Sequence, residues 1–255
     1  MNKGSDKPSP SRGSYEEDYF KETYGCDGLR KFGMHWWSVR FYAAVVDRWL
    51  RRIKGKRILE VGCGHGFMLG RLEGKHETFG VDISEYAIRQ AKQFAPKSRC
   101  FVADIESGLP SELEPSTFDI VVAKYVFEHL QQPLPAMQRI AKLLRPRGIL
   151  FFSVPNTESR GARLKGKTWY AHKDPTHRSL LPPDRWLQMV GEAGLSLVKE
   201  FSDGYWDVPY IPWLPLWIQF PIFVGPSALA CLTGRDILPA RFGENILVIA
   251  ERPGK

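Results

Sequence analysis

Cysteine is scarce in this chain, and its few cysteines are scattered. Cys26, Cys63, Cys100 and Cys231 are the only four among 255 residues, and no two of them form a Cys-x-x-Cys pair. This spacing argues against a disulfide framework. Reduced thiols are typical of a cytoplasmic protein, which is the location that we expect.

A leader sequence is also missing from the N-terminal residues. Residues 1–14 are polar, with Pro, Gly, Ser and Lys but no apolar core, so they show no signal pattern. We expect a disordered tail there. The remaining length is sufficient for one α/β domain with a sizeable core.

Two phosphate-binding signatures are absent around the most informative stretch, which runs from Ile58 to Phe67. An apolar run ends in Glu60 and is followed by glycines at alternate positions, and then by residues with a helical pattern. The third glycine of a dinucleotide fingerprint is replaced by Phe67, and no Gly-Lys-Ser/Thr follows. This strand, turn and helix predict a binding corner for a ligand that is not held through phosphate.

The pattern Glu60-x-Gly62-x-Gly64-x-Gly66 resembles motif I of the class I S-adenosylmethionine (SAM) dependent methyltransferases. The resemblance implies SAM as the cofactor, with these four residues at its binding site. Segments ahead of this motif commonly cap cofactor and acceptor in the family, and the stretch from Tyr15 to Trp37 is strongly aromatic. The alternative is that these aromatic side chains pack on the core. We therefore predict that 1–32 holds the tail and an N-terminal lid segment, and that 33–255 is the methyltransferase domain.

Acidic residues follow the next two predicted strands as well. Asp82, with Ile83 after it, lies about 20 residues beyond the glycine turn, where an acid binds ribose hydroxyls in nucleotide-binding folds. The resemblance implies that Asp104 receives the adenine amino group and that the backbone of Ile105 meets the ring. Tyr125, near the end of the fourth predicted strand, is assigned to the same cofactor site.

The segment Phe127-Glu128-His129-Leu130 resembles the one after strand four in small-molecule methyltransferases related to ubiquinone-biosynthesis enzymes. The resemblance implies an α/β three-layer sandwich with a Rossmann-like, seven-stranded, mostly parallel sheet whose last strand is antiparallel. His129 either acts as general base or contacts the cofactor, or it buttresses the loop. The strands are predicted at 57–61, 78–83, 100–105, 118–126, 149–154, 195–201 and 245–250.

A first insertion, 157–181, leaves the carboxyl end of the sheet and is rich in polar and aromatic residues. Its candidate bases are His172 and His177, and its candidate acceptor-binding residues are Trp169, Tyr170 and Asp174, together with Asn156 at the start of the loop. His172, Asp174 and His177 are also a conceivable metal set. Methyl transfer needs no metal, so we assign none. A role in bracing the loop remains the alternative.

A second insertion, 204–243, separates the last two strands. It contains no charged residue from 208 to 234, and its apolar length alone would predict a membrane span. The last strand must return to the sheet, however, and five prolines argue against a regular helix. Peripheral membrane contact through 208–234, on the cytoplasmic face, and an apolar lid over the acceptor are the two remaining interpretations.

Positive charge is concentrated between Arg139 and Arg185, where eleven Lys or Arg residues face three acids, an excess that equals the net charge of +8. A solvated face, an anionic membrane, a phosphorylated acceptor and nucleic acid are the alternatives. No RNA-binding signature accompanies the charge, so nucleic acid is not expected. We predict methyl transfer to an oxygen of a lipophilic or lipid-linked small molecule or glycan. The alternatives are an RNA or protein methyltransferase and a soluble-metabolite N- or C-methyltransferase, and the oligomeric state is left open.

Overall fold

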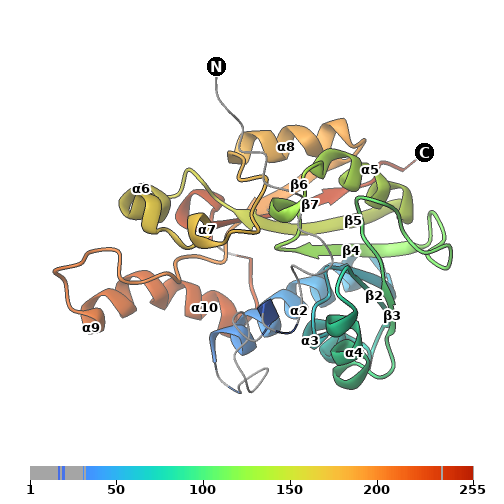
Figure 1. The fold of residues 1–255 in the computed structure, drawn as a ribbon, viewed down its shortest axis with the longest axis horizontal. Helices are drawn as coiled ribbons and strands as arrows, with labels where there is room; N and C mark the ends of the chain where they lie inside the picture. The colour runs from blue at the N-terminus through green and yellow to red at the C-terminus, as the bar shows by residue number, and fades with distance from the viewer. Residues whose placement is uncertain (1–16, 18, 21–30, 32, 237, 255) are drawn as a thin grey trace.

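One seven-stranded sheet, in the order β3-β2-β1-β4-β5-β7-β6, forms the middle layer of the computed structural model (Figure 1). Its strands β1 to β5 are mutually parallel, and β7 runs antiparallel to both β5 and β6. The strands are β1 (Arg57–Val61), β2 (Glu77–Asp82), β3 (Arg99–Val102), β4 (Phe118–Lys124), β5 (Leu144–Pro155), β6 (Ser196–Phe201) and β7 (Asn245–Glu251). The predicted fold class and its antiparallel last strand are therefore confirmed.

The structure describes residues 17, 19–20, 31, 33–236 and 238–254. The predicted tail and most of the predicted lid segment in 1–32 lie outside these residues. That domain assignment stays a prediction.

Helices cover both faces of the sheet (Figure 1). On one face lie α5 (Pro133–Leu143) and α8 (Pro183–Glu192), whose Met137, Ile140 and Trp186 are packed into the larger core. The other face is covered by α2 (Met34–Ile53), α3 (Phe67–Leu72) and α4 (Glu85–Phe94). Strands β1 and β4 are covered on both sides, which explains their continuous apolar runs.

The first insertion folds into α6 (Arg160–Lys165), the 3₁₀ turn η3 (Gly166–Thr168) and α7 (Tyr170–Lys173). Two further 3₁₀ turns are η2 (Phe127–His129) after β4 and η5 (Ala240–Phe242) before β7. Several predicted boundaries were wrong. β5 begins at Leu144 instead of at the predicted 149, and β3 ends at Val102 instead of at the predicted 105, so that Asp104 lies on the turn after it.

The second insertion corrects the prediction that its prolines prevent a helix. Helical residues run without a break through α9 (Leu216–Gln219), the π-helical η4 (Phe220–Val224) and α10 (Gly225–Thr233). Pro215 precedes the first turn, and Pro221 and Pro226 lie at the first two positions of η4 and α10. Proline is tolerated in a first turn, and a π segment re-arranges the hydrogen bonds that an internal proline cannot make.

Candidate functional site

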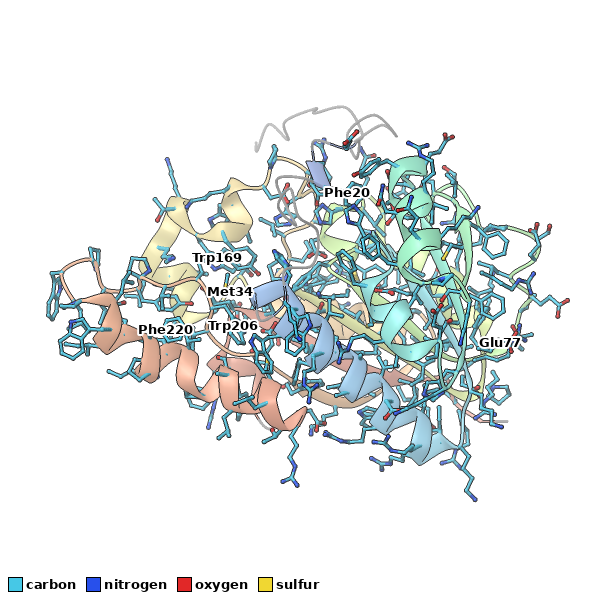
Figure 2. The ribbon with its side chains drawn as sticks, turned by 90° about the horizontal axis from the view of Figure 1, so that it is seen from below. Phe20, Met34, Glu77, Trp169, Trp206 and Phe220 are labelled. Carbon is cyan, nitrogen blue, oxygen red and sulfur yellow. The ribbon has the colours of Figure 1, made fainter. Side chains whose placement is uncertain are left out.

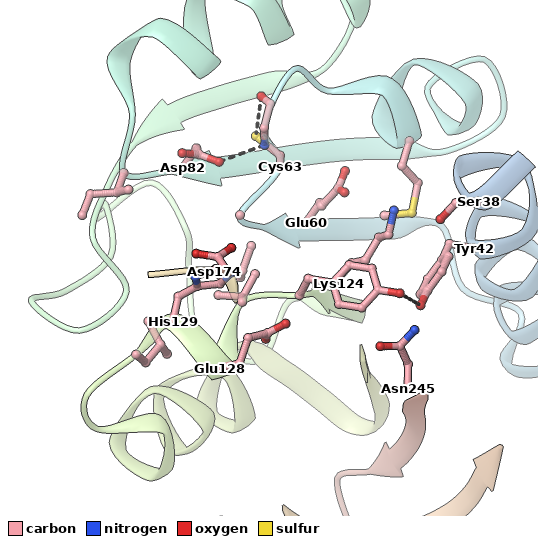
Figure 3. A pocket seen from close by; sticks show the side chains of 18 of the residues that line it. Ser38, Tyr42, Glu60, Cys63, Asp82, Lys124, Glu128, His129, Asp174 and Asn245 are labelled. Atoms are coloured by element: carbon pink, nitrogen blue, oxygen red, sulfur yellow. Dashed lines mark hydrogen bonds between the residues drawn. The ribbon is translucent and has the colours of Figure 1, made fainter. Parts of the chain in front are cut away.

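A cavity of about 800 Å³ opens at the carboxyl ends of the strands (Figure 3). Residues at or just beyond the ends of β1, β2, β4 and β6 line it, and so do residues from α2 and from both insertions. A parallel sheet gathers strand ends at one edge, so side chains that are distant in sequence meet there.

The glycine turn shapes the wall of this cavity after β1. Gly62, Gly64 and Gly66 have φ of +66°, +50° and +73°, a backbone region that glycine adopts without strain. A Cβ on Gly62 would lie 2.5 Å from Cγ2 of Val126, and one on Gly66 would lie 3.0 Å from Cα of Ala91. Gly62 and Gly64 line the cavity, whereas Gly66 lets α3 and α4 approach closely.

Asp82, at the end of β2, holds this turn in place. Its Oδ2 accepts from the backbone N–H of Gly64 at 2.8 Å, and its Oδ1 accepts from the N–H of Ser84 at 2.9 Å. Burial raises the pKa of Asp82, and these two backbone donors act against that shift. Each oxygen keeps a second lone pair for a ligand.

Glu60, at the end of β1, differs from Asp82 in its hydrogen bonding. It is buried at the cavity, and its Oε2 has no hydrogen-bond partner among the described residues. Burial raises its pKa to about 8, although the nearby Lys124 counteracts this effect. The ammonium group of Lys124 lies 4.8 Å from the ring centre of Tyr42, in the region between Glu60 and that ring (Figure 3). An orphaned buried carboxyl oxygen is well suited to a cationic ligand.

Asp104 and Ile105 lie at the same end of the cavity, beyond β3. Asp104 closes its own turn, because its Oδ1 accepts from the N–H of Glu106 at 2.8 Å and its Oδ2 accepts from the hydroxyl of Ser107 at 2.6 Å. The carboxylate is thus fixed at the rim, where a planar ring can lie against the turn.

Two histidines meet in the cavity lining contributed by η2 and the first insertion. The rings of His129, in η2, and His177, in the first insertion, are 4.8 Å apart. Nδ1 of His177 lies 2.6 Å from the carbonyl oxygen of Ala171, which only accepts, so this nitrogen carries the proton. Nε2 of neutral His177 is therefore the basic nitrogen, and it lies 3.7 Å from Oδ2 of Asp174. Burial lowers the pKa of His129 to about 4, which keeps that ring neutral.

Glu128 lies beside the two histidines and is almost completely buried (Figure 3). Neither carboxyl oxygen has a hydrogen-bond partner in the described part of the chain, and burial raises its pKa well above the usual range. Ligand atoms of Glu128, His129 and His177 lie within 4.8 Å of one another, so these residues have the types and spacing to hold a metal ion. The metal set considered from sequence included His172, which is exposed and bonded through Nδ1 to the carbonyl of Gly166.

Comparison with known proteins identifies the family of the chain that forms this cavity. Residues 35–200 match the family described as a methyltransferase domain. The chain belongs to this methyltransferase family. The predictions of a SAM-dependent methyltransferase, of an enzyme and of SAM as cofactor are thereby confirmed.

Named relatives share part of the chain. The ubiquinone biosynthesis O-methyltransferase of Neisseria meningitidis serogroup A is 35% identical over 109 residues, covering 40% of this chain and 45% of that protein. The enzyme of the same name from Methylococcus capsulatus is 26% identical over 199 residues, covering 69% of this chain and 84% of that protein. The chain thus spans less than half of the first relative's length.

Solved structures resemble the methyltransferase over most of its length. The magnesium protoporphyrin IX methyltransferase of Synechocystis PCC 6803, with bound SAH, gives a TM-score of 0.62 at 16% identity, covering 94% of this chain and 97% of that one. A SAM-dependent methyltransferase from Archaeoglobus fulgidus gives 0.55 at 20% identity, covering 92% and 98%. At such low sequence identities, these TM-scores establish a shared fold only.

The methyltransferase cavity gathers all the residues predicted for the site except four, which are Gly66, His172, Trp169 and Asn156. Trp169 is fully buried in the first insertion and donates from Nε1 to Glu244 at 3.2 Å. The side-chain amide of Asn156 donates to the carbonyls of Ala240 and Gly243. These contacts brace the two insertions against each other, which was the alternative considered for this loop.

Sequence reasoning missed a polar cluster around Asp203 of the methyltransferase. Asp203, two residues beyond β6, accepts from the hydroxyls of Tyr42 at 3.3 Å and Tyr125 at 3.0 Å, and from the amide of Asn245 at 3.0 Å. Tyr125 has φ of +53°, which turns its side chain into this cluster. One signal was available, because Asp203 is a fourth acid that follows a strand.

Two aromatic residues ahead of the domain reach the methyltransferase cavity beside the glycine turn. Tyr19 and Phe20 both line it, and Phe20 is buried, with its ring stacked on His65 of the glycine turn at 5.0 Å. Figure 2 shows Phe20 beside α3 and α4 and well apart from Phe220 of the second insertion. This placement is the one expected of a segment that covers the cofactor.

Proposed function

We propose that this enzyme transfers the methyl group of SAM to an oxygen atom of a lipophilic or lipid-linked small molecule. The observation that carries the proposal is one cavity whose lining combines two chemically different groups of residues. Glu60, Asp82 and Asp104 form the group of strand-end acids, which we call the cofactor end, and His129 and His177 form the other, which we call the histidine end. Its volume of about 800 Å³ has room for a cofactor beside an acceptor.

The cofactor end has donors and acceptors that fit SAM. The turn at Gly62 and Gly64 lets the backbone approach a ligand that a side chain would obstruct. Glu60 offers an unpartnered buried oxygen to the positively charged methionine part, and Asp82 offers lone pairs to two ribose hydroxyls. Asp104 faces the adenine in this arrangement. When bound, SAM supplies a methyl group that its positive sulfur makes electrophilic.

The histidine end fits an acceptor that loses a proton. Nδ1 of His177 is held by the carbonyl of Ala171, so Nε2 is set to take the proton of a hydroxyl as its oxygen attacks the methyl carbon. His129 is kept neutral beside it, which avoids a competing positive charge. Positioning and exclusion of water supply much of the remaining rate, and Phe20 over the glycine turn contributes to that exclusion.

Two further observations favour an oxygen acceptor with an apolar part. Relatives from Neisseria and Methylococcus are named O-methyltransferases of ubiquinone biosynthesis. The second insertion adds a long apolar helix next to the cavity, and Cys231 on that helix lines the cavity. An apolar portion of the acceptor would have matching surface there.

Labelled SAM tests the proposal. The protein is incubated with SAM carrying ¹⁴C in its methyl group and with an extract of the cells that make it. The products are then divided into an organic phase, an aqueous phase and an acid precipitate. We expect label in the organic phase, released as methyl iodide by hydriodic acid, which cleaves methyl ethers. Asp82→Ala is the control for cofactor-dependent labelling.

Label in the aqueous phase would instead indicate a soluble metabolite, and label in the acid precipitate would indicate RNA or protein. Organic label that resists hydriodic acid would point to a carbon or nitrogen acceptor. Each of these results would overturn the proposed acceptor while leaving the enzyme class intact.

A further inference from the structure

The helix that runs from Leu216 to Thr233 has its large apolar side chains on the outside. Its buried positions are Gln219, Val224, Ser227, Ala230 and Cys231, most of them polar or small. The exposed large apolar side chains along the same helix are Leu216, Trp217, Phe220, Ile222, Leu229 and Leu232. A helix that packs on a soluble protein shows the reverse distribution, so this outer face suits an apolar environment.

The loop ahead of the helix extends the apolar surface. Trp213 is 82% exposed and Trp217 is 76% exposed, more than any other large apolar side chain in the described part of the chain. Gln219 fixes this loop, because its Oε1 accepts from the N–H groups of Tyr210 and Ile211 and its Nε2 donates to the carbonyl of Leu214. The exposed tryptophans therefore stand on a braced loop and helix. We call Trp213 and the exposed helix residues the outer face.

Positive charge lies beside the outer face. Lys165, from the first insertion, forms an ion pair with Asp207 at 2.8 Å and lies 5.2 Å from the ring centre of Tyr210. This contact sets α6 next to the loop that leads to the helix, as Figure 2 also shows. The neighbouring Arg163 and Lys167 are exposed, and so is the apolar Leu164 between them. Arg235 is exposed just past the other end of the helix.

The opposite side of the helix forms part of the cavity wall. Cys231 lines the cavity, as do Trp206 and Asp207 on the strand-to-helix connection. One helix therefore separates the reaction chamber from whatever covers its outer face.

We propose that the outer face docks the protein on an anionic phospholipid membrane, with the helix lying in the plane of the interface. The two tryptophans match the depth at which indole rings sit among lipid headgroups, and the leucines and Phe220 reach the acyl boundary. Arg163, Lys167 and Arg235 meet the negative headgroups at the rim. The docking proposal rests on these observations and does not depend on the proposed function. If both hold, an acceptor can keep its apolar part in the bilayer during methyl transfer.

A second copy of the chain is the rival occupant. A two-fold contact through the outer face would bring the basic residues of both copies to the rim of one patch. That arrangement adds repulsion between like charges. Anionic lipid satisfies the apolar side chains and the positive charges together, which is why we assign the surface to a membrane.

Vesicle flotation tests the docking. The protein is mixed with vesicles of phosphatidylcholine and phosphatidylglycerol at seven to three, and with vesicles of phosphatidylcholine alone. We expect the wild type to float with the mixed vesicles. The double variant Trp213→Ser/Trp217→Ser should lower the partition coefficient at least about tenfold, because two indole rings no longer leave water. Leu197→Ser/Val198→Ser removes two exposed apolar side chains from β6 and should leave flotation unchanged.

A charge variant separates the two contributions. Arg163→Glu/Lys167→Glu should weaken binding to the mixed vesicles and make the remaining binding less sensitive to salt than that of the wild type. Absence of wild-type flotation on mixed vesicles would overturn the proposal. So would a dimer in sedimentation velocity without lipid that Trp213→Ser/Trp217→Ser dissociates, because a second copy would then cover the outer face. Labelling with methyl-labelled SAM in detergent extract reports the proposed function separately, since it needs no bilayer.

Discussion

Glu60 and Asp82 end neighbouring parallel strands, yet their carboxyl groups are held in opposite ways. Two backbone N–H groups bind the Asp82 carboxylate, whereas Oε2 of Glu60 has no hydrogen-bond partner in the described part of the chain. Burial raises the pKa of both groups, and the backbone donors of Gly64 and Ser84 favour the charged form of Asp82. The charged Asp82 is therefore suited to accept from hydroxyl groups, and the unpartnered oxygen of Glu60 is suited to interact with a cation.

Asp82→Ala should weaken SAM binding about a hundredfold, because hydrogen bonds to a charged group typically contribute about 1.5–3 kcal/mol each. The loss also frees the N–H of Gly64, which Asp82 holds at 2.8 Å. Isothermal titration with SAM measures the effect. Asp104→Ala should weaken binding as well, but without loosening the glycine turn. Unchanged affinity in Asp82→Ala would exclude it from the cofactor site.

His177→Ala should lower kcat at least about a hundredfold and leave SAM affinity close to that of the wild type, because a positioned base contributes at this scale. His172→Ala is the matched control. His172 lies in the same insertion but is exposed and outside the cavity lining, so its loss should leave kcat nearly unchanged. Turnover with labelled SAM and direct titration separate the two parameters. Equal kcat in the wild type and His177→Ala would remove His177 as the base.

At the level of elements, the sequence was most informative where local pattern and packing agree. The segments ending at Val61 and Lys124 are strands covered by helices on both faces, and this burial explains their continuous apolar runs. The helix from Leu216 to Thr233 could not be predicted in this way. Its prolines fall at first-turn positions that only the three-dimensional path of the chain defines, and its apolar residues are not turned toward the core.

Gln219 is the residue on which the shape of the second insertion depends. Gln219→Leu should leave the backbone groups of Tyr210, Ile211 and Leu214 without their partners and loosen the loop around Trp213. Limited digestion with chymotrypsin, mapped by mass spectrometry, should show cleavage at Trp213 about tenfold faster. Leu216→Ser changes an exposed neighbour and should digest like the wild type. An unaltered rate in Gln219→Leu would mean that the loop is held by other contacts.

At the level of the whole molecule, the site is assembled from segments that no local pattern connects. Strand-end acids predicted the cofactor half of the cavity, since each parallel strand delivers its last residue to one edge. The cluster of Tyr42, Tyr125 and Asp203 depends on contacts across 161 and 78 positions. Its formation requires α2 to pack against β4 and β6 to join the sheet beyond β7. Those placements follow from tertiary packing, which a single sequence leaves undetermined.

The global stability of the protein should depend on pH through Glu60. Its pKa is about 8 in the folded protein against 4.5 for the ordinary group, so its contribution is fully present below about pH 4.5 and is lost as the pH rises through 8. The contribution of His129 to the free energy of unfolding changes with pH in the opposite sense. It changes below about pH 6.5, outside the window from 6.5 to 8.5. In that window the free energy of unfolding should fall by about 1 kcal/mol per pH unit.

Urea denaturation at several pH values checks this slope, and Glu60→Gln should reduce it while weakening SAM binding. Glu128, whose pKa burial also raises, contributes a slope of the same sign in both proteins. A slope that is the same in both proteins would show that another group is responsible. The cationic cofactor favours the charged form of Glu60, so SAM binding should release a proton near pH 7.5. Titration in buffers of different ionisation enthalpy detects that proton.

Strand β7 lies between β5 and β6, although it is the last of the seven to be synthesised. On the ribosome, β6 therefore has no neighbouring strand to pair with until residues 245–251 have left the exit tunnel. The sheet can therefore close only as a late step, when the last strand inserts between β5 and β6 and joins the edge strand to the rest.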